Sequence, residues 1–203
     1  FYNETKGKAI APTPTIGGVG IVTNINKMIT IDFKEIDNYI LVIGKTSGHL
    51  PQSEFLNIIA GDKDGPPPEI NLFNEKNNGL SVKELISKDL VKSIHDISAG
   101  GIIIALTEMC IAGKIGAKIK IPHNKISSQE YLFGEDQSRY LIEVNNKNKE
   151  KVSKLLDKNN TYYEIIGKTH KDTLDVDKKF KIKLSDLYQF NSFWFNNYFK
   201  ENS

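Results

Sequence analysis

The sequence predicts an α+β fold of the α/β type, in which a mixed β-sheet is packed with helices. Short runs of β-branched and apolar residues, each ended by a glycine or a polar turn, alternate with segments of helical periodicity. In addition, residues 139–166 read as strand, helix and strand. That order is typical of a split β-α-β unit within a sheet covered by helices.

Composition excludes several classes of function. The 203-residue chain has a formal net charge of only +2, and its lysines are spread along it, so we expect neither a nucleic-acid partner nor a membrane partner. No apolar run reaches the ~18 residues of a membrane span, and no charged-then-apolar leader opens the sequence. Cys110 is the only cysteine, which excludes a disulfide and a thiolate metal cluster. A reducing compartment, the cytoplasm, is therefore expected.

Strands are expected where apolar runs end at turn residues, namely at 16–22, 39–44, 117–121, 140–144 and 162–166. Helices are expected at 53–59, 69–76, 81–87 and 147–157, with the second and third separated by the turn 77–79. The tail 184–199 is rich in aromatic residues. We expect it to be core or a docking face, since it would otherwise be a large exposed apolar patch.

The most informative stretch lies at the centre of the chain. An apolar run over 90–94 predicts a short strand, which His95 and Asp96 interrupt. A nearly continuous apolar run over 102–112 then predicts a helix that is buried on most of its faces. Asp96 and Ser98 are both suitable N-caps for that helix.

Gly100 and Gly101 stand where better helix formers would serve, so either a ligand or another chain segment needs bare backbone there. A strand that leads into a glycine-rich helix N-terminus suits a phosphate or a carboxylate. The alternative is that the glycines allow close packing of the helix on the sheet, while His95 and Asp96 cap the turn.

A second polar cluster directly precedes the strand at 140–144. Glu135, Asp136 and Gln137 could hold a ribose hydroxyl, an amide or a metal, and Arg139 could hold a phosphate. The alternative is a solvated turn with an internal Arg-carboxylate pair. If the strands at the two clusters are antiparallel neighbours, both clusters flank one crevice.

The loop after the strand at 39–44 invites comparison with a phosphate-binding P-loop because it contains Gly44, Lys45 and Thr46. That motif also needs a glycine five residues before its Gly-Lys pair, where Tyr39 stands, so we reject it. His49 further along the loop is either a solvated residue or a ligand contact.

Five motifs occur in the order found in phosphoribosylformylglycinamidine synthase, and the chain resembles the C-terminal part of that family almost end to end. They are APTPTIGGVGIV (11–22), GKTSGHLPQSEFL (44–56), GPPPEINL (65–72), SIHDISAGG (93–101) and FGEDQSRYLIEV (133–144). The resemblance implies the C-terminal α/β domain of the aminoimidazole ribonucleotide synthetase-like fold over 31–203. Residues 1–30 would then be a linker and the last strands of a truncated ATP-binding domain.

The function implied is that of a carbon-nitrogen ligase with glutamine as amido donor, in purine biosynthesis. It converts formylglycinamide ribonucleotide to formylglycinamidine ribonucleotide with ATP and Mg²⁺, and a glutaminase subunit or domain, with or without a small bridging subunit, supplies ammonia. The alternatives are another ATP-dependent kinase or dikinase of the superfamily, and a non-catalytic interaction module that retains the fold.

The resemblance places no catalytic residue and no metal ligand in this segment, so the isolated chain is expected to be inactive. Glu135, Asp136 and Gln137 match in position a substrate-binding Glu-Ser-Gln triplet of the family's first half, but the middle residue differs. His95, Asp96, Ser98, Gly100 and Gly101 of the first cluster match the family's HDxSxGG turn, which implies a phosphate-facing role or a role in packing between domains. The candidate substrate- or nucleotide-binding residues are Glu135, Asp136, Gln137, His95, Asp96, Ser98, Gly100 and Gly101.

Overall fold

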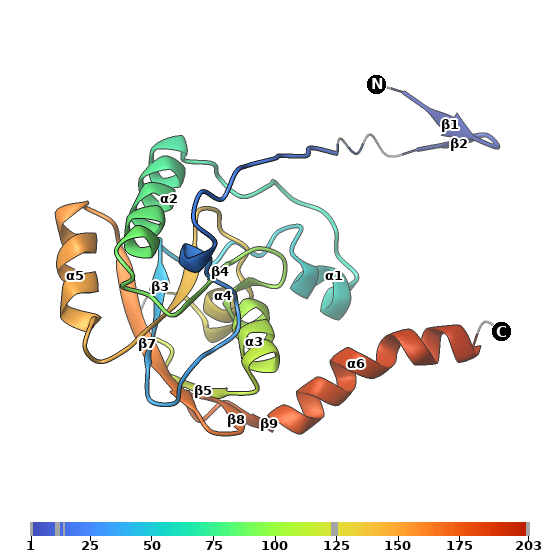
Figure 1. Cartoon of the computed structure of the whole chain (residues 1–203). Coiled ribbons are helices and arrows are strands. Elements are labelled where there is room, and N and C mark those ends of the chain that lie inside the picture. The colour runs from blue at the N-terminus through green and yellow to red at the C-terminus, as the bar shows by residue number, and fades with distance from the viewer. Residues whose placement is uncertain (1, 11–12, 14, 123–125, 202–203) are drawn as a thin grey trace.

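The computed structural model describes residues 2–10, 13, 15–122 and 126–201, and a seven-stranded mixed sheet forms its centre (Figure 1). The strand order is β4-β6-β3-β7-β5-β8-β9, and every neighbouring pair is antiparallel except β5 and β8. The strands are β3 (Tyr39–Ile43), β4 (Ser93–Asp96), β5 (Gly116–Ile119), β6 (Tyr140–Val144), β7 (Tyr163–His170), β8 (Thr173–Val176) and β9 (Phe180–Lys183). The predicted α+β class with a mixed sheet is confirmed.

The split β-α-β unit is also confirmed. Strand β3 lies between β6 and β7 and pairs antiparallel with both, so β6 and β7 run parallel to each other with one strand between them. Helix α5 (Lys149–Lys158) makes the connection. It buries Val152, Leu155 and Leu156, the three apolar residues that its 3.6-residue periodicity places on one face.

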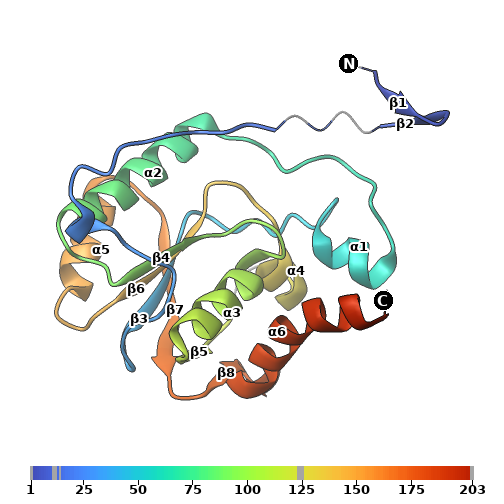
Figure 2. The same ribbon diagram turned by 45° about the vertical axis from the view of Figure 1, so that its right-hand side comes forward.

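Helices cover both faces of the sheet, and alternate residues of β3 serve two separate cores (Figures 1 and 2). On one face, α3 (Gly101–Gly113) and α4 (Ser128–Phe133) pack with a core that includes Ile40, Val42, Ile102, Leu106 and Met109. On the other face, α2 (Leu72–Ser87) and α5 pack with Leu41, Ile43, Leu85, Val152 and Leu156. A central strand that is buried on both faces reads as a continuous apolar run, as the sequence of β3 does.

One carboxylate is fully buried in this sheet. Glu143 of β6 is 0% exposed and accepts hydrogen bonds from the backbone N–H groups of Lys34 (2.9 Å) and Glu35 (3.1 Å). Asn38 Nδ2 (2.7 Å) and Ser93 Oγ (2.9 Å) also donate to it. Four donors therefore compensate the desolvated charge, and the segment that leads into β3 is fixed to the sheet.

The prediction of two helices at 69–76 and 81–87 is wrong, because α2 is a single helix that passes through the expected turn. Tertiary contacts override the weak local signal. The Asn78 side chain is buried and donates to the carbonyl of Ser138 (2.9 Å). Gly79 passes close to the Tyr140 hydroxyl, which would lie 3.7 Å from a Cβ added there.

The strand expected at 16–22 is not formed. This segment is irregular and exposes Ile16, Val19 and Ile21, each more than 90% accessible. The regular structure around it is short: β1 (Glu4–Thr5) and β2 (Lys8–Ala9) form a hairpin, and a 3-10 turn spans Ile25–Lys27. A strand needs a hydrogen-bonding neighbour, and within the described residues none lies beside this segment.

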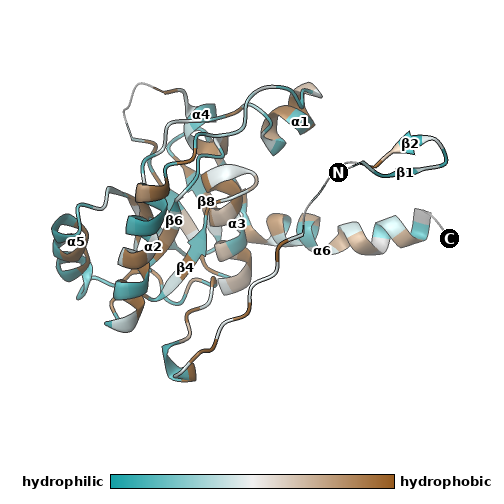
Figure 3. Ribbon diagram, turned by 90° about the horizontal axis from the view of Figure 1, so that it is seen from above, coloured by the Kyte–Doolittle hydropathy of each residue, from teal (hydrophilic) through white to brown (hydrophobic). Residues whose placement is uncertain are grey.

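The aromatic tail forms the helix α6 (Leu184–Glu201), which projects from the body of the molecule (Figures 2 and 3). Leu184 and Leu187 pack against the core beside α3, whereas Trp194 and Phe195 are more than half exposed. The tail is therefore not core. Among the helices of the described ranges, α6 included, none has the length and hydropathy needed to cross a membrane.

Candidate functional site

The turn between α4 and β6 carries two carboxylates, and both accept hydrogen bonds from backbone N–H groups. Glu135 Oε1 accepts from the N–H of Gly100 (2.8 Å), immediately before α3. It also accepts from the N–H of Glu54 (2.8 Å), the first residue of α1 (Glu54–Ala60), whose N-cap is Ser53 as the sequence suggests. One side chain thus links the beginnings of two helices, where a negative charge is favourable.

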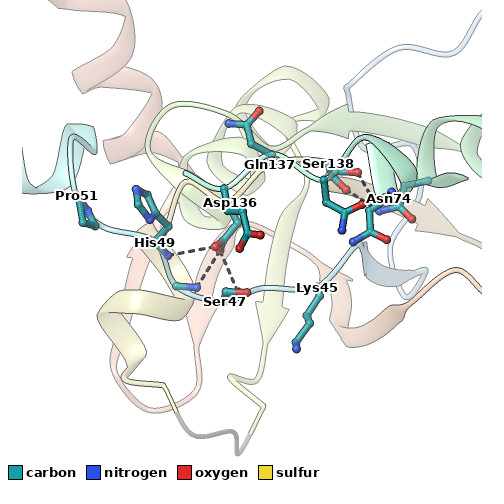
Figure 4. A pocket seen from close by; sticks show the side chains of 12 residues that line it. Lys45, Ser47, His49, Pro51, Asn74, Asp136, Gln137 and Ser138 are labelled. Atoms are coloured by element: carbon teal, nitrogen blue, oxygen red, sulfur yellow. Dashed lines mark hydrogen bonds between the residues drawn. The ribbon is translucent and has the colours of Figure 1, made fainter. Parts of the chain in front are cut away.

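Asp136 is bound to the loop that follows β3. Its carboxylate accepts from three successive backbone N–H groups, those of Ser47 (3.1 Å), Gly48 (2.9 Å) and His49 (3.3 Å) (Figure 4). Arg139 Nη1 lies 3.6 Å from Asp136 Oδ2. The carboxylate is therefore held by one cation and three oriented dipoles.

Arg139 is buried, with 2% of its surface exposed. Its guanidinium donates to the carbonyl of Gly134 (2.6 Å), the carbonyl of Asp136 (3.1 Å) and the hydroxyl of Thr46 (3.2 Å). Desolvation lowers the pKa of this group, and the nearby charge of Asp136 opposes that shift. In this structure Arg139 contacts protein acceptors, and the alternative of an internal Arg-carboxylate pair is confirmed, although the pair is largely buried rather than solvated.

The two predicted clusters meet, as expected for antiparallel neighbours. Strand β4 pairs with β6 so that Asp96 lies opposite Tyr140, and Glu135 then reaches Gly100 across the gap. The details of the first turn differ from expectation. His95 and Asp96 belong to β4 rather than interrupting it, and α3 begins at Gly101 with no side-chain cap.

The two glycines at the beginning of α3 are explained by a neighbouring chain segment. Gly100 and Gly101 have φ values of +78° and +71°, which favour glycine. A Cβ on Gly101 would lie 2.7 Å from the carbonyl oxygen of Leu132 and 2.8 Å from that of Gly134. Close packing and a left-handed turn therefore require these residues.

The remaining residues of the first cluster face α3 or solvent. His95 Nε2 lies 2.8 Å from Glu108 Oε2, and Nδ1 lies 3.3 Å from Asp96 Oδ1. Ser98 is exposed, and its carbonyl accepts from the N–H of Gly101 (3.1 Å). These contacts join the end of β4 to the beginning and the middle of α3.

A polar cavity of about 480 Å³ opens beside the second cluster (Figure 4). Of the eight candidate residues, only Asp136 and Gln137 line it. His49, for which the sequence left a ligand contact open, also lines the cavity. The other lining residues were not among the candidates, and they come from the loop after β3, the beginning of α2 and the turn before β6: Lys45, Ser47, Gly48, Pro51, Glu69, Asn71, Asn74, Asn78 and Ser138. His49 Nε2 lies 3.1 Å from the carbonyl oxygen of Pro66.

A helical signal could have found part of this lining. Asn71, Asn74 and Asn78 recur at intervals of three and four residues, so a continuous helix places them on one face. Within the described ranges, no group of three or more His, Cys, Asp or Glu side chains is arranged to hold a metal ion. The cavity instead offers hydroxyl and carboxamide groups for hydrogen bonding.

Comparisons with known proteins agree with this architecture. The family described as AIR synthase related protein, C-terminal domain, matches residues 35–178. Phosphoribosylformylglycinamidine synthase subunit PurL of Pelagibacter ubique is 50% identical over 198 residues, 98% of this chain and 27% of that protein. The corresponding subunit of Rhodopseudomonas palustris BisB5 is 38% identical with the same coverage. The chain therefore spans about a quarter of the length of these relatives.

The fold also resembles a solved structure of Thermotoga maritima PurL complexed with FGAR, with a TM-score of 0.72 and 17% identity. The similarity covers 81% of this chain and 30% of that one, and identity this low shows the fold alone. The family match spans most of the chain, including the sheet from β3 to β8 and both polar clusters. The chain belongs to the AIR synthase related protein family, and its residues 35–178 match the C-terminal domain of that family.

Proposed function

We propose that this chain is the C-terminal part of an ATP- and glutamine-dependent ligase that converts formylglycinamide ribonucleotide to formylglycinamidine ribonucleotide. The observation that carries the proposal is the 50% identity to a PurL subunit over 98% of the chain. In the reaction, ATP phosphorylates the formamide oxygen, and ammonia then displaces phosphate to give the amidine. Preorganised electrostatics would be the main catalytic contribution in such a phosphoryl transfer.

The ATP and Mg²⁺ sites are assigned mainly to the part of the ligase that this chain does not span. In support, both carboxylates of the second turn are engaged with backbone N–H groups. The eight candidate residues are accordingly assigned to an auxiliary site or to an interface. Residues 1–30 are assigned to the last part of the ATP-binding domain and a linker, a proposal that the exposed apolar side chains of 16–22 support.

Ammonia would come from a glutaminase subunit or domain, with or without a small bridging subunit. A solved assembly is described as PurLQS from Thermotoga maritima, and a comparable assembly is proposed for the ligase that contains this chain. The cytoplasm is the proposed location, in agreement with the single buried thiol of Cys110.

The test is an assay of the full-length protein that contains this chain, with formylglycinamide ribonucleotide, Mg-ATP, and either ammonia or glutamine with the glutaminase. We expect amidine and phosphate to form in equal amounts. Phosphorylation without nitrogen transfer would favour a kinase of the superfamily instead, and no reaction with either nitrogen source would favour the non-catalytic module.

The isolated chain provides a second check. We expect it to show no turnover and no micromolar binding of Mg-ATP in isothermal titration. Tight binding by residues 1–203 alone would show that the nucleotide site has been assigned to the wrong part of the ligase.

A further inference from the structure

The loop after β3 has the geometry of an anion-binding concavity, and the chain itself supplies the anion. The N–H groups of Ser47, Gly48 and His49 converge on the carboxylate of Asp136 at 2.9 to 3.3 Å. Successive backbone N–H groups that point to one spot form a binding site for phosphate or carboxylate. A phosphate in the cavity would have to displace Asp136 to use these donors.

Displacement would be costly because Asp136 also faces a buried cation. Its side chain is only 12% exposed, and the guanidinium of Arg139, with no exposed side-chain surface, lies 3.6 Å away. Removing the carboxylate from this position would leave a buried charge and three N–H groups without their acceptor.

The rest of the cavity wall offers no comparable concentration of positive charge. Its polar groups are mostly uncharged hydroxyls and carboxamides, from Ser47, Asn71, Asn74, Asn78, Gln137 and Ser138. The other lining residues that can carry a charge are two with basic side chains, Lys45 and His49, and one further carboxylate, Glu69. We propose that Asp136 fills the anion position of this cavity and thereby excludes phosphate groups from it. The exclusion of phosphate from this cavity does not depend on the reaction proposed for the ligase.

The test uses the ¹⁵N-labelled chain, titrated with inorganic phosphate while the amide signals of Ser47, Gly48 and His49 are followed. The wild type should show no saturable change. Asp136→Ser should show saturable shifts of all three signals, with an affinity roughly tenfold or more above that of the matched control Glu69→Ser. That control removes a carboxylate from the same cavity but leaves the loop occupied by Asp136.

Two results would overturn the proposal: saturable phosphate shifts in the wild type, or equal gains in the two variants. If Asp136→Ser is unfolded in phosphate-free buffer, phosphate should restore its cooperative melting transition, because the ion would replace the missing acceptor. A variant that stays unfolded in phosphate would count against the proposal in the same way.

A different observation supports a second inference, which concerns α6 and rests on the proposed function. Leu184 and Leu187 pack on the first core, and the face that they define continues toward the end of the helix. Along that face lie Tyr188, Trp194, Phe195, Tyr198 and Phe199, each at least half exposed. We call these five residues the aromatic stripe.

Exposed apolar surface of this kind marks an interaction site. Tryptophan and tyrosine are also the residues that most often carry binding energy at interfaces. The relatives are almost four times as long as this chain, so most of such a ligase lies outside it. We infer that the aromatic stripe docks on an apolar surface of the remaining part of the same polypeptide.

Hydrogen exchange with mass spectrometry can compare residues 1–203 with the full-length ligase. Amides of 190–200 should exchange roughly tenfold more slowly in the full-length protein. The double variant Trp194→Ala/Phe195→Ala should lose that protection, whereas Ile58→Ala, an exposed apolar site on α1, should keep it. Equal exchange in both proteins would overturn the inference, as would concentration-dependent protection in the isolated chain, which would indicate a second copy. Neither result depends on whether the ligase reaction is observed.

Discussion

Helices α3 and α6 are both rich in large apolar residues, but the chain covers very different fractions of their surfaces. In α3, the buried residues are Gly101, Ile102, Ile103, Ala105, Leu106, Met109 and Cys110. Among the described side chains of α6, Leu184 and Leu187 alone pack against the core, and the aromatic residues remain exposed. Helix α3 lies within the family match at 35–178, whereas α6 lies beyond it. The apolar content of a helix therefore does not show by itself how much of its surface its own domain buries.

The largest effect is expected from truncating α3. Leu106 is 0% exposed, so Leu106→Ala should lower the free energy of unfolding by about 3 kcal/mol through lost burial and a cavity. Urea denaturation measures this change. Ile104→Ala, on the same helix but 42% exposed, is the matched control and should cost less than about 1 kcal/mol. Equal losses would contradict the description of α3 as a helix with one fully packed face.

A second prediction concerns the beginning of α3. Gly101→Ala should cost about 2 kcal/mol because its φ is +71° and the new methyl would meet two carbonyl oxygens closer than 3 Å. Gly79→Ala, inside α2 with no atom nearer than 3.7 Å, should be neutral or stabilising. Thermal melting of the two variants distinguishes a position that requires glycine, Gly101, from a helical position that does not, Gly79.

A third prediction concerns pH. Burial raises the pKa of the Cys110 thiol from 9.0 to about 12. The unfolded chain therefore releases this proton first, and stability falls as the pH rises from 9 toward 12. At pH 10 the loss from this group should be about 1 kcal/mol relative to pH 8. Cys110→Ala should show a shallower decline over the same interval, and identical pH profiles would contradict burial of the thiol.

The smallest effect is expected in α6. Trp194→Ala should change the stability of the isolated chain by less than about 0.5 kcal/mol, because the side chain is 61% exposed and little burial is lost. Chemical denaturation followed by circular dichroism is the measurement. A loss close to that of Leu106→Ala would contradict the exposure of the Trp194 side chain.

Local sequence patterns were sufficient to predict the elements whose ends or buried faces are marked by their own residues or by adjacent ones. The apolar run of β3 ends at Gly44, α1 begins at the Ser53 cap, and the spacing of Val152 and Leu156 marks the inner face of α5. Helix α2 was not predictable in this way. The local propensity of Asn78 favours a turn, and its stabilising hydrogen bond goes to the carbonyl of Ser138, sixty residues away. Helix α4 and strands β8 and β9 were missed altogether.

For the site, the sequence indicated which residues are polar and clustered, but not which atoms they contact. The proximity of Glu135 to the beginning of α3 followed from antiparallel pairing of β4 and β6. The partners of Asp136 could not be deduced, because they are backbone N–H groups of a loop 87 to 89 residues earlier. From the sequence alone, any polar side chain could have been the acceptor for these N–H groups. Whether the candidate residues bind a ligand stays a prediction.

The buried carboxylate of Glu143 has a consequence for how the sheet selects its alignment. Side chains alternate between the two faces of a strand, so a slip of β6 by one residue would turn Glu143 toward the other core. There it would meet Leu85 and Leu156 rather than the donors from Lys34, Glu35 and Asn38. An unpaired charge in that environment costs several kcal/mol, more than a shifted hydrogen-bond ladder could recover. Glu143 therefore favours the native register of β6 during folding, because a sheet with β6 shifted by one residue would bury an unpaired carboxylate.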